Sequence, residues 1–149
     1  MPSTYTSLNY HFVFSTKRRV RIINPSWEGE LHAFLGGCLR NIQGSPLEIG
    51  GDLDHVHILT GLRSKHRVCD VLCDVKSASS RWVHEHWGLR SFEWQVGYGA
   101  FSANAFNMMK LRNYIRNQKE HHKKVSFETE FAELMRMAGI DFDWAKQKD

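Results

Sequence analysis

Hydrophobic and polar residues alternate from Leu8 to Ser15, and this period of two predicts a β-strand near the start of the chain. Similar patterns predict strands at residues 47–51, 55–62 and 92–102, with a tight turn at 52–54. Helical spacing of apolar residues predicts helices from Pro25, after the capping Asn24, to just before Gly44, and at about 68–87, 103–122 and 127–137. The order is therefore β-α-β-β-α-β, followed by further helix.

This order is typical of a ferredoxin-like α+β fold, in which two helices cover one face of a four-stranded antiparallel sheet. We expect a single domain over residues 1–149, with a core at about 5–124 that includes the additional long helix. A helical extension follows at about 125–149. The second face of the sheet must be covered by other segments or used for binding.

The composition narrows the class of protein. Hydrophobic residues make up 42% of the 149 positions and charged residues 24%, which excludes an intrinsically disordered chain. The longest apolar runs fall short of the ~18–20 residues that a membrane span needs, and residues 1–5 do not resemble a secretory signal. Because Cys38, Cys69 and Cys73 cannot all pair with one another, we expect reduced thiols and a cytoplasmic location.

The charges are unevenly distributed along the chain. Twenty Lys and Arg against sixteen Asp and Glu give a net charge of +4, which is a modest excess. Basic residues cluster at 17–21, at 63–67 and between 110 and 124, whereas acidic residues gather in the C-terminal tail. One basic cluster is ordinarily a solvated loop, but three that flank candidate site residues favour a nucleic-acid partner.

The third predicted strand contains the sequence His55-Val56-His57. Because side chains alternate along a strand, both imidazoles lie on one face, with Cα atoms roughly 6.5–7 Å apart, while Val56 and Ile58 dock on the helices. Two imidazoles at this separation on an open sheet face can converge on one cation. Taken alone, such a pair is more often two half-exposed polar residues on a sheet face, so other features must support the metal site.

A polar stripe on the last long helix contains a tyrosine. Lys110, Tyr114 and Gln118 share one face, and Leu111 belongs to the apolar stripe beside it. A tyrosine hydroxyl ordinarily titrates near 10, so it acts as a nucleophile when a cation assists it or polarises its target. The alternative is a surface tyrosine whose ring packs against Leu111.

A zinc site is a competing interpretation of another helix. His66, Cys69 and Cys73 are spaced by three and four residues and would share a helical face. The sequence offers no evident fourth ligand, and helix packing explains the two cysteines.

Four segments together resemble the IS200/IS605-type transposases, the small single-tyrosine members of the HUH endonuclease superfamily. They are residues 10–19, 50–59, 94–102 and 114–124. The resemblance extends from about Tyr5 to Ile140.

The resemblance implies a role for each candidate residue. His55 and His57 match the histidine pair that binds a divalent cation, Mg²⁺ or Mn²⁺, and Gln118 matches the third metal ligand. Tyr114 matches the nucleophile. The family binds hairpins at the ends of insertion sequences and cuts single-stranded DNA, leaving a 5′-phosphotyrosine and a free 3′-hydroxyl. It acts as a homodimer in which the tyrosine helix of one subunit completes the site of the other.

The basic clusters then become candidate phosphate contacts, which position DNA without reading its sequence. These residues are Lys17, Arg18, Arg19, Arg63, Lys65 and Lys110. Two alternatives remain open. One is a domesticated relative that processes repeated chromosomal palindromes with the same chemistry. The other is a non-catalytic ferredoxin-like module that binds single-stranded nucleic acid, which would not need the histidine pair, the tyrosine and the glutamine together.

Overall fold

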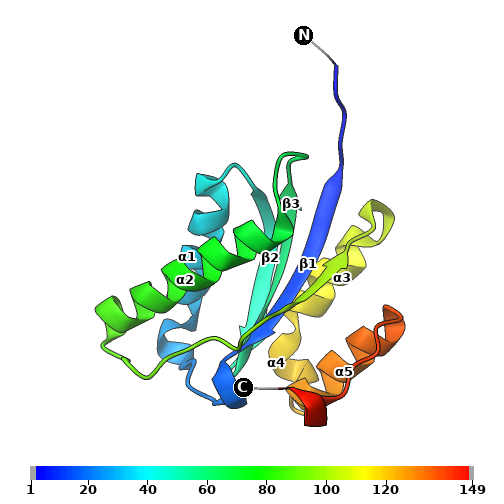
Figure 1. The fold of residues 1–149 in the computed structure, drawn as a ribbon. Helices are drawn as coiled ribbons and strands as arrows, with labels where there is room; N and C mark the ends of the chain where they lie inside the picture. Colours follow the sequence, from blue (N-terminus) through cyan, green and yellow to red (C-terminus); the bar gives the residue numbers. More distant parts are fainter. Residues whose placement is uncertain (1–2, 148–149) are drawn as a thin grey trace.

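The computed structural model describes residues 3–147, in which four strands form one antiparallel sheet. The strands are β1 (Leu8–Ser15), β2 (Ser45–Asp52), β3 (His55–Leu62) and β4 (Gly99–Ser102), in the spatial order β2-β3-β1-β4 (Figure 1). At the ends of the central pair, Ser15 lies opposite His55 and Leu8 opposite Leu62. This topology confirms the predicted α+β, ferredoxin-like fold.

Two long helices, α1 (Pro25–Asn41) and α2 (Val68–Trp87), cover one face of the sheet (Figure 1). α1 begins as predicted, because the Asn24 side chain accepts a hydrogen bond from the Ser26 backbone N–H. The main core lies between these helices and the sheet. Its fully buried side chains include Phe12, Phe14, Leu31, Leu35, Val56, Ile58 and Val83.

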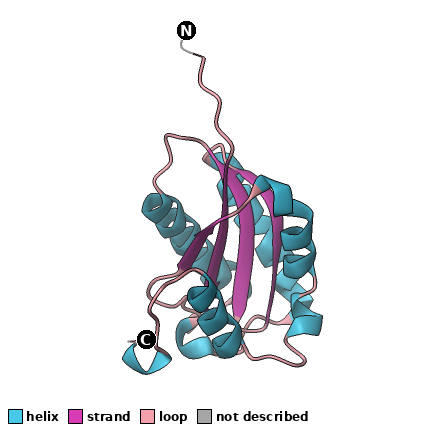
Figure 2. Ribbon diagram, turned by 90° about the vertical axis from the view of Figure 1, so that its right-hand side faces the viewer, coloured by secondary structure: helices cyan, strands magenta, loops and turns pink. Residues whose placement is uncertain are grey.

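The second face is covered by the C-terminal part of the chain, so that helices lie on both sides of the sheet (Figure 2). These elements are α3 (Met108–Arg116), α4 (Gln118–His121) and α5 (Phe127–Met137), with short 3₁₀ turns at Ala105–Asn107 and Trp144–Lys146. A smaller core forms where Phe127, Phe131 and Met135 of α5 pack with Val13 of β1. The face expected to be open is therefore partly filled by apolar side chains.

The fourth strand is shorter than predicted. Of residues 92–102, Gly99–Ser102 form the paired strand, and Trp94 makes an isolated bridge with Thr16. Gly97 adopts a φ of 95° between these two points, which turns the chain away from the sheet. Phe92 and Trp94 are apolar because both are buried in the main core, and not because they belong to a strand.

The helix predicted from about residue 103 to 122 is divided. Asn104 caps a 3₁₀ turn, and α3 begins at Met108. Asn117, with φ −98° and ψ 23°, separates α3 from α4 and redirects the chain between Tyr114 and Gln118. The polar stripe is thus carried by two short helices.

The tyrosine-bearing helix lies directly on β2. A Cβ atom built on Gly50 would come within 2.2 Å of the Ile115 carbonyl oxygen, which is far inside van der Waals contact. Ile115 itself is fully buried. The missing side chain at Gly50 therefore permits α3 to approach the sheet and fixes the height of Tyr114 above it.

The described residues bear on two expectations from the sequence, which concern reduced thiols and membrane-spanning helices. Cys38, Cys69 and Cys73 are all free thiols. Between residues 3 and 147, helices long and apolar enough to cross a membrane are absent.

Candidate active site

His55 and His57 project from β3 towards the C-terminal helices. Both side chains are fully buried, and their rings meet edge to face with centroids 5.1 Å apart. Val56 and Ile58 point to the opposite face and lie in the main core, as the alternation predicts. The expectation of an open face around the histidines is wrong, because the ring of Phe127 from α5 stacks on His55 at 4.5 Å.

Gln118 is the first residue of α4, and its side chain is fully buried beside the histidine pair. Its Oε1 atom lies 2.9 Å from His55 Nε2. The same oxygen lies 2.8 Å from Nε2 of His122, which follows the end of α4. The structure thus brings the predicted third ligand to the histidines and adds a third imidazole that the sequence did not single out.

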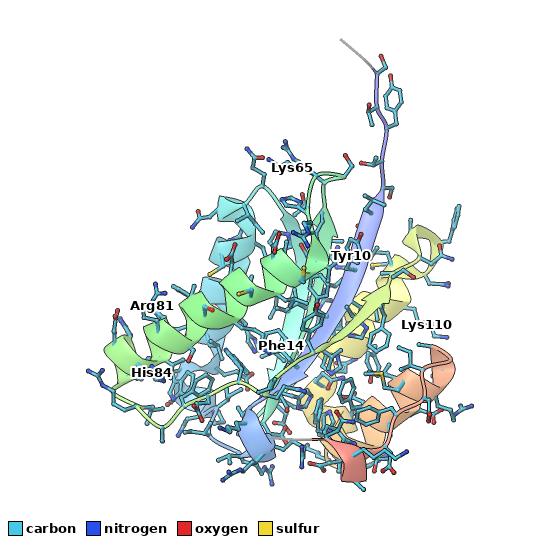
Figure 3. The ribbon with its side chains drawn as sticks, in the orientation of Figure 1. Tyr10, Phe14, Lys65, Arg81, His84 and Lys110 are labelled. Atoms are coloured by element: carbon cyan, nitrogen blue, oxygen red, sulfur yellow. The ribbon has the colours of Figure 1, made fainter. Side chains whose placement is uncertain are left out.

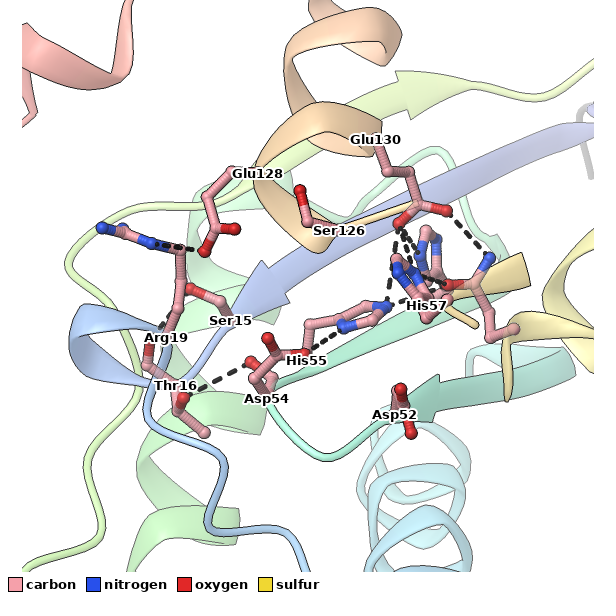
Figure 4. Close-up of polar contacts among 12 residues, drawn as sticks. Ser15, Thr16, Arg19, Asp52, Asp54, His55, His57, Ser126, Glu128 and Glu130 are labelled. Atoms are coloured by element: carbon pink, nitrogen blue, oxygen red, sulfur yellow. Dashed lines mark hydrogen bonds and ion pairs between the residues drawn. The ribbon is translucent and has the colours of Figure 1, made fainter. Parts of the chain in front are cut away.

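Glu130 from α5 is the residue on which these side chains converge (Figure 4). Its Oε1 atom lies 3.0 Å from His57 Nε2, 3.2 Å from His122 Nε2 and 3.7 Å from His55 Nε2. Its Oε2 atom accepts a hydrogen bond from Gln118 Nε2 at 3.0 Å. In the described chain, ligand atoms of these three histidines and Glu130 all lie within 4.8 Å of one another.

Tyr114 reaches the same carboxylate from α3. Its hydroxyl donates a hydrogen bond to Glu130 Oε2, and its ring lies edge-on to His57 with centroids 5.8 Å apart. All of these residues belong to one chain. Within this chain, the close approach at Gly50 lets α3 fold back on its own sheet, an arrangement that favours a site completed by one subunit. The homodimer and the sharing of sites between its subunits stay predictions.

The electrostatics of the cluster centre on Glu130. Burial opposes its charge, but hydrogen bonds from His122 and His57 outweigh this and hold the pKa of the Glu130 carboxyl well below its usual range. Burial, together with the Glu130 charge, raises the pKa of the Tyr114 hydroxyl well above its ordinary value. Burial also lowers the pKa of His57 to about 4. In this arrangement, Tyr114 is a protonated hydroxyl held by an ionised carboxylate.

The six predicted basic residues do not form one surface. Lys17, Arg18 and Arg19 form a 3₁₀ turn directly after β1, at the end of the sheet that holds His55. Arg63 and Lys65 follow the other end of β3, roughly 20–25 Å away along the strand. Figure 3 shows Lys65 at that far end, with Lys110 on α3 between the two groups.

The basic turn after β1 is strained and tied to the C-terminal tail. Arg18 and Arg19 both have a φ of 57°, a left-handed conformation that costs a non-glycine residue roughly 1–3 kcal/mol. The Arg19 guanidinium pairs with Glu128 at 2.9 Å and lies 4.4 Å from the centre of the Trp144 ring. The tail therefore orients part of the predicted DNA-binding surface.

A groove of about 1230 Å³ leads to the tyrosine between α3 and α5. Tyr114 and Lys110 of α3 line one side together with Asn107 of the preceding 3₁₀ turn, and Glu130 and Glu133 of α5 line the other. The lining also includes His11 of β1 and residues 102–104 at the end of β4. The nucleophile predicted from the sequence thus lies in a cavity open to solvent.

The competing zinc site is not assembled. Cys69 and Cys73 are exposed, and His66 instead bonds the backbone, with Nδ1 accepting from Arg63 N–H at 2.9 Å. Its Nε2 lies 2.7 Å from the Ile42 carbonyl oxygen. His66 therefore organises the loop before α2.

A family model and two solved structures that resemble this chain all belong to transposases. The family model described as "Transposase IS200 like" matches residues 4–118. A crystal structure of a candidate transposase from Deinococcus radiodurans R1 superposes with a TM-score of 0.63 at 22% identity, covering 79% of this chain and 95% of that one. A REP-associated tyrosine transposase bound to a REP hairpin gives a TM-score of 0.60 at 15% identity, covering 84% and 74%. Curated proteins gave no match.

A ferredoxin-like sheet with paired histidines on a central strand and a tyrosine on the covering helix defines the single-tyrosine transposase class. The family match spans most of the chain and includes all four predicted site residues. The chain belongs to the IS200-like transposase family. The match ends at Gln118, so α5 and Glu130 lie beyond it.

Proposed function

We propose that this transposase nicks and rejoins single-stranded DNA through a covalent link to Tyr114. One observation carries the proposal: the Tyr114 hydroxyl, the His55 and His57 imidazoles and the Gln118 amide meet in one buried cluster at the end of a groove. A module that merely binds nucleic acid would gain nothing from burying this set together, because each buried polar group must be compensated.

The proposed reaction is a transesterification. The Tyr114 oxygen forms a bond to the scissile phosphorus, and the bond from phosphorus to the 3′ oxygen breaks. The hydroxyl proton passes to that oxygen, so the products are a 5′-phosphotyrosine and a free 3′-hydroxyl. Attack by a 3′-hydroxyl on the phosphotyrosine reverses the step and rejoins DNA. Because one phosphoester replaces another, rejoining needs no nucleotide hydrolysis.

The donor atoms at the site fit a divalent cation. His55, His57 and Gln118 would hold it, with imidazole nitrogens that suit Mn²⁺ better than Mg²⁺. Such an ion supplies charge neutralisation and orientation at the scissile phosphate. Tyr114 lies beside the His57 ring and therefore close to the position that the cation would occupy. Holding the nucleophile near a phosphate bound at that position lowers the barrier to the reaction.

We propose hairpin-forming DNA as the substrate. The solved REP-associated transposase is bound to a REP hairpin, which supports this substrate class. The same neighbour favours processing of repeated palindromes as a second candidate role with identical chemistry. In either role, the single strand would lie in the groove between α3 and α5, with Lys110 and the basic turn after β1 as phosphate contacts.

The test is cleavage of an end-labelled strand with a hairpin beside the cut site, in the presence of Mn²⁺. We expect a protein–DNA adduct on a denaturing gel, its loss on chelation, and a peptide phosphorylated at Tyr114 in mass spectrometry. Tyr114→Phe should abolish the adduct, whereas Tyr98→Phe, a partly buried tyrosine of the main core, should not. An adduct that persists in Tyr114→Phe would refute the assignment of the nucleophile.

A further inference from the structure

Two imidazoles of the cluster have their outer nitrogens committed as proton donors. His55 Nδ1 lies 2.7 Å from Asp54 Oδ1, and His122 Nδ1 lies 2.7 Å from the Val125 carbonyl oxygen. Both partners are acceptors, so each Nδ1 donates its proton outwards, and each Nε2 points into the cluster. Histidines that bind metals characteristically donate their other N–H to a carboxylate or a backbone carbonyl.

The two inward Nε2 atoms face acceptor oxygens. Gln118 Oε1 lies 2.9 Å from His55 Nε2 and 2.8 Å from His122 Nε2. Reversing the amide would let its NH₂ group donate to the imidazoles, but it would place the amide oxygen 3.0 Å from Glu130 Oε2. Each orientation therefore leaves acceptor atoms facing one another unless a cation lies between them.

The geometry points to Glu130 and His122 as two additional ligands of the divalent ion, which makes α5 part of the metal centre. This inference rests on the metal site proposed above. It converts a set of two imidazoles and one amide into one with three imidazoles, an amide and a charged carboxylate oxygen. The carboxylate supplies the hard, anionic ligand that the His55, His57 and Gln118 set lacks.

The separations agree with ligands of one ion. Two donor atoms that are each about 2.1 Å from a metal lie about 3.0–3.4 Å apart at octahedral or tetrahedral angles. Glu130 Oε1 lies 3.0 Å from His57 Nε2, 3.2 Å from His122 Nε2 and 3.7 Å from His55 Nε2. Small side-chain adjustments would therefore bring all four atoms to one centre.

The two oxygens of Glu130 have different partners. Oε1 faces the three imidazoles, whereas Oε2 accepts from the Tyr114 hydroxyl and from Gln118 Nε2. As a ligand through Oε1, Glu130 would also be a positioning residue for the nucleophile through Oε2. The carboxylate would tie Tyr114 to the metal centre at a fixed place.

The test measures metal binding on the full chain without DNA. Mn²⁺ affinity is determined by calorimetry, and Co²⁺ gives an absorption spectrum that reports its ligands. We expect Glu130→Gln and His122→Gln each to weaken Mn²⁺ binding at least tenfold and to change the Co²⁺ spectrum. Glu133→Gln is the matched control, because Glu133 lies on the same helix, is exposed and pairs with Arg136.

A second measurement uses the unmodified protein and needs no folded variant. Saturating Mn²⁺ should slow amide hydrogen exchange along α5, because the ion would join α5 to β3. If Glu130→Gln and His122→Gln bind Mn²⁺ like the control and α5 exchange is unchanged, the additional ligands are refuted while the proposed function stands. If the unmodified protein binds neither ion, the metal site of the proposed function fails as well.

Discussion

Substitution of Gly50 by alanine tests whether the position of the tyrosine helix controls the reaction. The new Cβ would lie 2.2 Å from the Ile115 carbonyl oxygen, whereas ordinary contact begins at 3.4 Å, so α3 must retreat by roughly 1 Å. The obstacle is backbone, so a side-chain rotation cannot relieve it. A displacement of about 1 Å can lower a rate about 100-fold, and overpacking costs about 1–3 kcal/mol of stability.

The assay is single-turnover cleavage of the labelled hairpin strand at saturating protein, with urea unfolding measured in parallel. Gly29→Ala is the matched control, because α1 is open at this position and a helical alanine should stabilise the protein by about 0.4–1 kcal/mol. We expect Gly50→Ala to remain folded, bind DNA and cleave about 100-fold more slowly. Cleavage within threefold of the unmodified protein would show that α3 does not rest on Gly50 during the reaction.

Three further predictions follow from the same structure. Mixing His55→Ala with Tyr114→Phe should recover no cleavage even in a verified mixed dimer, since the site is complete within one chain; recovery would restore the shared-site model. Arg18→Ala combined with Arg19→Ala should weaken DNA binding and reduce its logarithmic salt slope by about 1.4, at ~0.7 per phosphate contact, and an unchanged slope would remove both from the DNA path. Burial lowers the pKa of His11 to about 3. The free energy of unfolding of the metal-free protein should therefore decrease as the pH falls from 6.5 towards 3, by up to about 1.4 kcal/mol per pH unit. Urea unfolding that is equally pH-dependent in His11→Asn would contradict this.

Periodicity predicted most of the fold because each regular element has one face in the core. β3 and α2 have the predicted bounds, and so does α5. The fourth strand was predicted too long, because burial of Phe92 and Trp94 in an irregular segment produces the same apolar alternation as a strand. The interruption of the helix at Asn117 could not be predicted from the sequence either. A single polar residue with altered φ and ψ leaves the helical spacing of the residues around it intact.

The candidate site was partly predictable for a different reason. His55 and His57 lie two residues apart on a strand, and Tyr114 and Gln118 lie four apart on a helical pattern, so local geometry associates each pair. Glu130 joins them through tertiary packing that no local spacing encodes. One signal was present: Glu130 falls between Phe127 and Phe131 on the apolar face of its helix, where a charge must have a buried partner.

The acidic tail acquires a physical role once its partners are known. A row of carboxylates beside a DNA groove would repel phosphate, but Glu128 pairs with Arg19, Glu133 with Arg136, and Glu130 with the imidazoles. Each charge is compensated locally, so the tail can close the second face of the sheet without an unpaired negative patch at these three positions. The helix outside the family match thereby supplies the carboxylate that accepts the hydrogen bond from Tyr114. Because the same carboxylate contacts the histidine pair, the acidic tail and the histidines belong to one site.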